Sequence, residues 1–132
     1  MFGFSKTEKL KSRKAIDELF ARGKSQSIFP IRISYQFLTI EVNEKPGLKV
    51  GVSVSKKHFK KAVDRNRIKR LLREAYRLQK NDLLELIEAK QLKGFVFFIY
   101  TDKTLPGYKI VFNTMTKCLE VLKRKINSEK PS

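Results

Sequence analysis

The sequence predicts an α+β fold in which helices pack against one sheet. Segments with an apolar residue at every second position indicate strands, and segments with a three-to-four-residue period indicate helices. They follow one another as helix, two or three strands, long helix, strand and helix. The 132 residues, 41% of them hydrophobic, are enough for one sizeable core. We see no repeat, low-complexity tract or linker, so residues 1–132 are predicted to form a single domain.

The first half of the chain predicts one helix and a pair of strands. The helix is expected over about residues 7–22 and ends at Gly23. A strand is expected over about 27–42, where the apolar parity changes near Phe37, as a bulge or strong twist would explain. After the turn "NEKPG", a strand over about 48–54 is expected to pair with the first.

The second half predicts two long helices around a buried strand. A helix over about 60–79 continues into the helical segment "NDLLELIEAK". Residues 94–100, "GFVFFIY", are apolar almost throughout, which indicates a strand covered on both faces. "LPGY" breaks the chain before an amphipathic helix over about 107–126 and a frayed tail at 127–132. Cys118 falls on the apolar stripe of that helix and is predicted to be core.

Charge is the strongest global feature. Thirty Lys and Arg against 13 acids give a net charge of +17, which favours a polyanionic partner. Nucleic acid is the first interpretation and an anionic membrane surface the second. A single cysteine agrees with a reducing compartment, and no apolar stretch approaches the about 18 residues of a membrane span. The N-terminal residues lack the pattern of a secretory signal, so a cytoplasmic location is expected.

Much of this charge lies between Lys56 and Lys80, where eleven basic and two acidic side chains give +9. On a helix, the apolar stripe of this segment would face the sheet; it consists of Ile68, Leu71, Leu72 and Ala75. On the opposite side, four polar side chains fall within about 60° of one another: Asn66, Arg70, Arg73 and Arg77. We call this row, with the flanking Arg67 and Lys69, the basic ridge.

The basic ridge is better explained as a binding surface than as a solvated helix face. Solvated faces usually mix charges of both signs and gain from pairs four residues apart, whereas this ridge is dominated by arginine. Guanidinium groups suit bidentate contacts with phosphate. Phe20, Phe29, Tyr35 and Phe37 could add the aromatic surfaces that bind single strands, although each alone is more often a core residue.

The segment "SVSKKHFKKAVDRNRIKRLLREAYR", residues 53–77, resembles the protein subunit of bacterial ribonuclease P. The signature is an Arg-Asn-Arg motif followed at set spacing by Lys-Arg and another Arg, and preceded by Lys-Lys and an Ala-Val pair. The flanking elements agree with that family along essentially the whole chain. The residues that carry the resemblance are Lys56, Lys57, Ala62, Val63, Arg65, Asn66, Arg67, Lys69, Arg70 and Arg73.

The resemblance implies a fold and a function. The fold is an α/β sandwich like the second domain of ribosomal protein S5, with a mixed sheet, a long basic helix after the second main strand and a left-handed crossover between parallel strands. The function is to assist a catalytic RNA in removing the 5′ leader of precursor tRNA, with Mg²⁺ held mainly by the RNA. No membrane or small-molecule cofactor is implied. The RNA-binding residues would be Lys56, Lys57, Lys60, Lys61, Arg65, Asn66, Arg67, Lys69, Arg70, Arg73 and Arg77. A cleft for the leader would be formed by Phe20, Tyr35, Arg32 and Phe37.

The sequence indicates no catalytic centre in the protein itself. Asp82, Glu85 and Glu88 fit a solvated helix face better than a metal site, and His58 is the single histidine. Three alternatives stay open: a ribosomal or RNA-chaperone protein, a membrane-surface protein, and a nuclease that needs no RNA. The first would bind many RNAs without stimulating cleavage, and the third would cleave precursor tRNA alone with Mg²⁺.

Overall fold

Four helices and four strands follow one another in residues 9, 10 and 12–128, the part of the chain that this computed structural model describes. In chain order they are α1 (Arg13–Arg22), β1 (Lys24–Ile28), β2 (Ile31–Thr39), β3 (Gly47–Val54), α2 (Ala62–Gln79), α3 (Asn81–Ala89), β4 (Leu92–Tyr100) and α4 (Tyr108–Ser128). The strands form one mixed sheet in the order β1-β2-β4-β3, with β3 parallel to β4 and the other neighbours antiparallel. The predicted α+β class is therefore confirmed.

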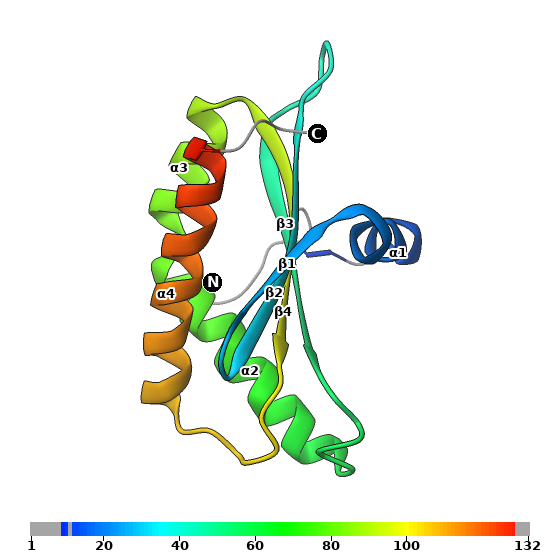
Figure 1. Ribbon diagram of the computed structural model, residues 1–132, viewed down its shortest axis with the longest axis vertical. Coiled ribbons are helices and arrows are strands. Elements are labelled where there is room, and N and C mark those ends of the chain that lie inside the picture. Colours follow the sequence, from blue (N-terminus) through cyan, green and yellow to red (C-terminus); the bar gives the residue numbers. More distant parts are fainter. Residues whose placement is uncertain (1–8, 11, 129–132) are drawn as a thin grey trace.

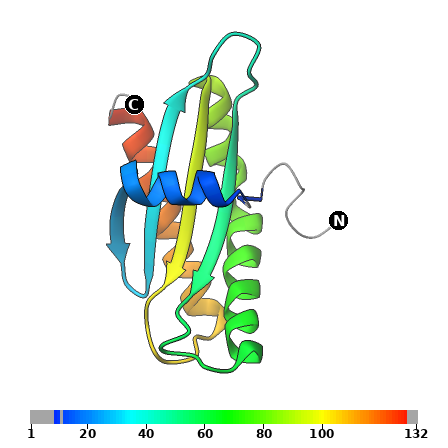
Figure 2. The same ribbon diagram turned by 90° about the vertical axis from the view of Figure 1, so that its right-hand side faces the viewer.

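The two faces of the sheet have different cover. Helices α2, α3 and α4 lie along one face, and α1 crosses the other (Figures 1 and 2). The face toward α2–α4 is mostly apolar and buried along β2, β3 and β4, because every second residue of these strands points into the core. The other positions of the three longer strands are Arg32, Ser34, Gln36 and Leu38 on β2, Lys93, Phe95, Phe97 and Ile99 on β4, and Gly47, Lys49, Gly51 and Ser53 on β3. We call this surface, which α1 crosses, the open face.

The segment expected to be one strand over 27–42 is a hairpin. β1 and β2 are joined at Phe29 and Pro30, and the closing pair is Ile28 with Ile31. Of the two explanations offered for the parity change near Phe37, a bulge is wrong, because β2 pairs with β4 in unbroken register along its whole length. The parity of the apolar residues changes at Leu38, which lies on the open-face side of β2 opposite Lys93. The next apolar residues, Ile40 and Val42, follow the end of β2 at Thr39 and lie in a loop.

The expected pairing of the strand at 48–54 with the first strand is also wrong. β3 lies beside β4 at the far edge of the sheet, and β4 separates it from β2. β4 is one of the two interior strands. It is buried along its core face and half-buried along the open face, so the cover expected on both faces is complete on one face only. In Figure 2, the chain leaves β3, passes behind the sheet through α2 and α3, and returns as β4 in a left-handed crossover. This handedness is the one that the family resemblance implies, and it opposes the general rule.

Helix α1 begins later than the expected residue 7. The Ser12 hydroxyl caps it by accepting a hydrogen bond from Ala15 N at 3.3 Å. Upstream of this cap, Lys9 forms an isolated bridge with Val50 of β3, and Leu10 N donates to the Val50 carbonyl at 3.0 Å. Residues 1–8 and 129–132, which include parts of the expected helix and tail, lie outside the described residues. At the other end, α4 continues to Ser128, two residues beyond the expected 126.

Candidate nucleic-acid interface

The rotation of α2 about its axis is fixed by its buried stripe. Ile68, Leu72, Ala75 and Tyr76 are fully buried against the sheet and α4. The opposite face, which carries the basic ridge, therefore points to solvent. Asn66, Arg67, Arg70 and Arg73 are all exposed. Among the described residues, the structure records no acidic partner for these three arginines. Three unneutralised guanidinium groups on one rigid helix are suited to binding phosphates.

The C-terminal part of the ridge is less available. Arg77 Nε donates to Glu74 Oε2 at 3.1 Å, and this hydrogen bond raises the pKa of Arg77 and lowers the pKa of Glu74. Lys69 is half-buried at the side of the helix. The accessible positive charge of the ridge is therefore concentrated at Arg67, Arg70 and Arg73, over about two turns of α2.

Arg65 holds the loop that precedes α2. Its Nη1 donates to the carbonyl oxygens of Phe59 at 2.7 Å and Lys60 at 2.8 Å. These bonds hold residues 55–61, which we call the basic loop, against the start of α2. The Phe59 ring also packs on Tyr100, with ring centroids 6.1 Å apart. The loop is thus anchored from both sides, and its lysines are exposed next to the ridge: Lys56, Lys57, Lys60 and Lys61.

The four residues expected to line the leader cleft do not share one surface. Phe20, which is 50% exposed, and Arg32 lie on the open face. Tyr35 is 3% exposed and lies with the half-buried Phe37 on the core face, so the structure does not bring these two residues to the surface that holds Phe20 and Arg32. The reason is strand alternation, because both share the parity of the buried Ile33.

Phe97 is an open-face aromatic that the sequence reasoning missed. Its ring meets Phe20 edge-on, with centroids 5.4 Å apart. The ring lies over Gly51 of the neighbouring strand, where an added Cβ would come within 2.2 Å of the ring. Phe97 has the same parity as Phe95 in "GFVFFIY", so strict alternation would have placed both on one face. The contact with Gly51 depends on the β3–β4 pairing, which the sequence did not indicate.

A small hollow connects the basic ridge with the open face. It has a volume of about 260 Å³ and lies at the outer edge of β3. Arg73 of the ridge and Phe97 of the open face both contribute to its wall, together with Gly51 and Lys9. The two candidate surfaces are therefore continuous around this edge of the sheet.

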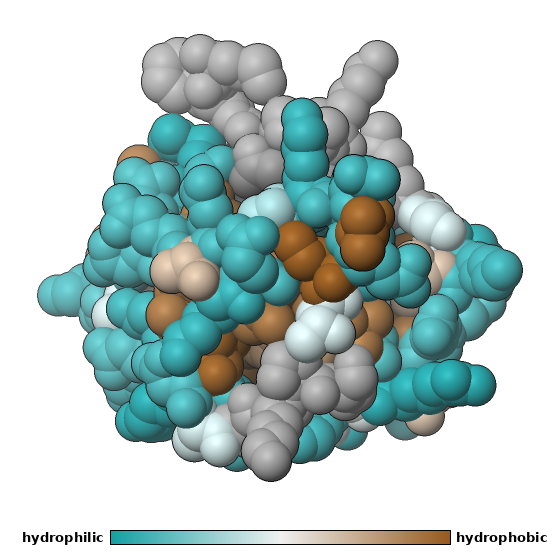
Figure 3. All heavy atoms as spheres, turned by 90° about the horizontal axis from the view of Figure 1, so that it is seen from above, coloured by the Kyte–Doolittle hydropathy of each residue, from teal (hydrophilic) through white to brown (hydrophobic). Residues whose placement is uncertain are grey.

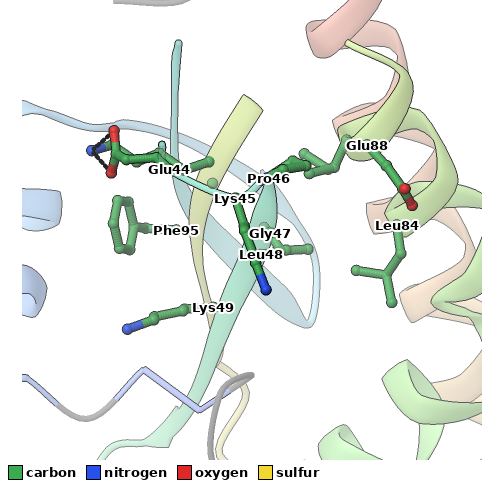
Figure 4. Close-up of a pocket in the computed structure, with 12 residues that line it drawn as sticks. Glu44, Lys45, Pro46, Gly47, Leu48, Lys49, Leu84, Glu88 and Phe95 are labelled. Carbon is green, nitrogen blue, oxygen red and sulfur yellow. Dashed lines mark hydrogen bonds and ion pairs between the residues drawn. The ribbon is translucent and has the colours of Figure 1, made fainter. Parts of the chain in front are cut away.

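A larger pocket, of about 750 Å³, has a different character (Figure 4). It lies at the end of the sheet where the β2–β3 loop meets α3. Figure 4 shows Leu84 and Glu88 on α3 across from Leu48 on β3. Seen from above, apolar side chains at this end lie between hydrophilic ones (Figure 3). Glu44 and Lys93 form an ion pair at 3.0 Å on its rim, so the pocket carries charges of both signs and does not extend the basic surface.

The chemistry that these residues support is binding. Within the described part of the chain, no three His, Cys, Asp or Glu side chains gather where they could hold a metal ion. Burial raises the pKa of the Cys118 thiol to about 12, so this core residue is not a nucleophile near neutral pH. Among the described helices, none has the length and apolarity that crossing a bilayer requires.

These features together are typical of a nucleic-acid-binding protein: a small α+β fold, an arginine ridge, a basic loop and an open face with aromatic side chains. The chain belongs to the Ribonuclease P family, which its sequence matches over residues 4–127. The resemblance seen in the Arg-Asn-Arg segment is thereby confirmed.

Individual relatives agree with this assignment. A protein of Porphyromonas gingivalis named "Ribonuclease P protein component" is 37% identical over 118 residues, which cover 89% of this chain and 85% of the relative. A protein of the same name from Chlorobium phaeobacteroides is 32% identical over 122 residues, covering 86% and 84%. The RNase P proteins of Staphylococcus aureus and Thermotoga maritima share the fold. The first superposes with a TM-score of 0.66 at 22% identity, covering 88% of this chain and 95% of that one. The second has a TM-score of 0.66 at 21% identity, covering 86% and 96%.

Proposed function

We propose that this chain is the RNA-binding protein component of a ribonuclease P ribonucleoprotein. In this role it assists a catalytic RNA in the endonucleolytic removal of the 5′ leader from precursor tRNA, in the cytoplasm. The observation that carries the proposal is the set of three exposed arginines on α2, whose orientation is fixed by the buried stripe. Family membership supplies the particular RNA partner.

The two continuous surfaces would bind different RNA segments. The basic ridge and the basic loop would bind the phosphates of the catalytic RNA. The open face would hold the single-stranded leader, with Phe20 and Phe97 as stacking surfaces and Arg32 as a phosphate contact. Support comes from their chemistry, because single strands are held by aromatic side chains beside positive charge. Arg65 would act as a positioning residue, because it holds the basic loop through two carbonyl oxygens.

Mg²⁺ would be held mainly by the RNA partner. The described residues of this chain offer no cluster of metal ligands. The protein would instead neutralise phosphates and add contacts with the leader, which raises the affinity of the RNA for substrate and for Mg²⁺.

The test is cleavage of a 5′-extended precursor tRNA at low Mg²⁺ with the protein alone, bacterial ribonuclease P RNA alone, and both together. We expect cleavage at the mature 5′ end only when both are present. Cleavage by the protein alone would show that it is a nuclease without need of RNA. Binding to the RNA with no gain in cleavage would favour an RNA chaperone instead.

A further inference from the structure

An aromatic residue far from the ridge in sequence lies on the same end of the molecule. Phe29 occupies the turn between β1 and β2 and is 69% exposed. Its neighbours on both sides are anchored. Ile28 packs against the core, and the buried Pro30 accepts hydrogen bonds at its carbonyl oxygen from Thr101 N at 2.8 Å and Thr101 Oγ1 at 3.1 Å. The turn that presents Phe29 to solvent is therefore held in place on both sides.

The sheet register places this turn near the basic loop. Ile31, the first residue of β2, pairs with Tyr100, the last residue of β4, and Tyr100 pairs with Val54, the last residue of β3. Since neighbouring strands are about 4.8 Å apart, the turn lies roughly 10–15 Å from the start of the basic loop. Both ribbon views show the β1–β2 turn, the β4–α4 loop and the β3–α2 loop together at the end where α2 begins (Figures 1 and 2).

The surroundings of the turn are positively charged. Lys103 is exposed two residues after Thr101, and the basic loop adds four exposed lysines beyond it. The acid in this segment, Asp102, accepts hydrogen bonds from Lys103 N at 2.7 Å and Thr104 Oγ1 at 2.9 Å, and its charge offsets one of these five positive charges. An exposed ring on a fixed support with cations around it has the components of a base-stacking site.

Two simpler explanations fit less well. Single exposed apolar side chains are common and need no function, but they do not call for an anchored turn beside a phosphate-binding loop. Self-association through Phe29 would bring together two chains that each carry a net charge of +17. An anionic partner with flat apolar faces satisfies both the ring and the charge.

We propose that Phe29 is a stacking platform for an unpaired base of the catalytic RNA that the basic ridge binds. The proposal rests on the function proposed above and adds a contact from the β1–β2 hairpin. The phosphates on either side of the stacked nucleotide would be neutralised by Lys103 and the basic loop.

The chain contains no tryptophan, so one substitution creates a site-specific reporter. Phe29→Trp would report stacking through quenching of its fluorescence. Val42→Trp is the matched control, because Val42 is 89% exposed in the β2–β3 loop at the opposite end of the molecule. With ribonuclease P RNA alone, we expect saturable quenching and protection from acrylamide at position 29, and no change at position 42. A signal that appears only after precursor tRNA is added would assign the platform to the substrate and overturn the proposal.

Affinity measurements separate stacking from shape. Phe29→Ala and Phe29→Leu should each weaken binding of ribonuclease P RNA by about five- to a hundredfold, and Phe29→Tyr should bind within about twofold of wild type. Leucine keeps the bulk and apolarity but has no ring face, so wild-type binding by Phe29→Leu overturns the proposal. A Phe29→Trp signal that depends on protein concentration without RNA also overturns it, in favour of self-association. If the wild-type chain fails to bind this RNA, the proposed function is refuted together with the stacking platform. If the wild-type chain binds and the Phe29 variants bind equally well, only the stacking platform is refuted.

Discussion

The basic ridge can be tested by removing three charges that the fold does not need. We would replace Arg67, Arg70 and Arg73 together with glutamine. All three are exposed, and none belongs to the buried stripe of α2. Glutamine has nearly the helix propensity of arginine, so α2 should remain intact. Any loss of RNA binding would then reflect the surface and not the fold.

The expected magnitude follows from counterion release. Each phosphate contact contributes about 0.7–0.9 to the slope of log K against log salt concentration. Three lost contacts should reduce the slope by about 2–3. At about 0.1 M salt the logarithm of the salt concentration is about −1, so each contact also adds about 0.7–0.9 to log K. Losing three contacts should therefore lower the affinity at this salt concentration by about 100- to 500-fold.

The assay is a titration of ribonuclease P RNA at several salt concentrations, with a matched variant of equal net charge. Lys109, Lys117 and Arg124 are exposed on α4, and replacing them with glutamine also removes three charges. We expect this control to lose less than about tenfold in affinity, because it changes the long-range field and no ridge contact. Equal losses for the two variants would refute the ridge as a site and leave net charge as the explanation. A circular dichroism melt of the ridge variant far below wild type would show that these arginines are structural.

Three further outcomes test the surrounding structure. Arg65→Lys should keep the charge but lose the Nη1 group that donates to two loop carbonyls, costing about 1 kcal/mol and speeding amide exchange of Phe59; unchanged exchange would contradict this positioning role. Gly51→Val should destabilise the fold by about 1–3 kcal/mol in urea unfolding, because its Cβ would meet the Phe97 ring, whereas Gly47→Ala, with nothing within 4 Å, should be close to neutral. Burial raises the pKa of Cys118 to about 12, so its native alkylation rate should not climb between about pH 8 and 10 as that of an exposed thiol does; a rise would place the thiol at the surface.

The ridge was predictable because its determinants are local. The 3.6-residue period of Ile68, Leu72 and Ala75 fixes which side of the helix is buried, and the arginines follow from the same period. The observed start of α2 at Ala62 lies within two residues of the predicted start, because the helix pattern begins directly after the Lys-rich loop. The period could not predict that Arg65 and Arg77 donate hydrogen bonds to neighbouring groups, because these bonds depend on side-chain positions in the folded state.

The open face was predicted poorly because its composition depends on pairing between distant strands. Alternation alone groups Tyr35 with Ile33 and separates both from Arg32, so the core position of Tyr35 could have been inferred. The neighbour relation of β3 and β4 could not, because the sequence order favours pairing of β3 with the strand before it. Without that relation, the approach of Phe97 to Gly51 has no sequence signal.

The geometry of α1 explains why an aromatic surface stays accessible in so small a protein. The helix crosses the strands instead of running along them (Figure 2). A helix is about 10 Å wide, whereas a strand of nine residues extends about 30 Å, so one crossing helix covers about a third of the strand length. The rest of the open face stays within reach of a ligand, and Phe20 at the helix edge is half exposed. Since the hollow at β3 joins this face to Arg73, the open face and the basic ridge form one continuous surface, on which we propose that two segments of RNA are held at the same time. That is the geometry a protein needs to bring a substrate strand to a catalytic RNA.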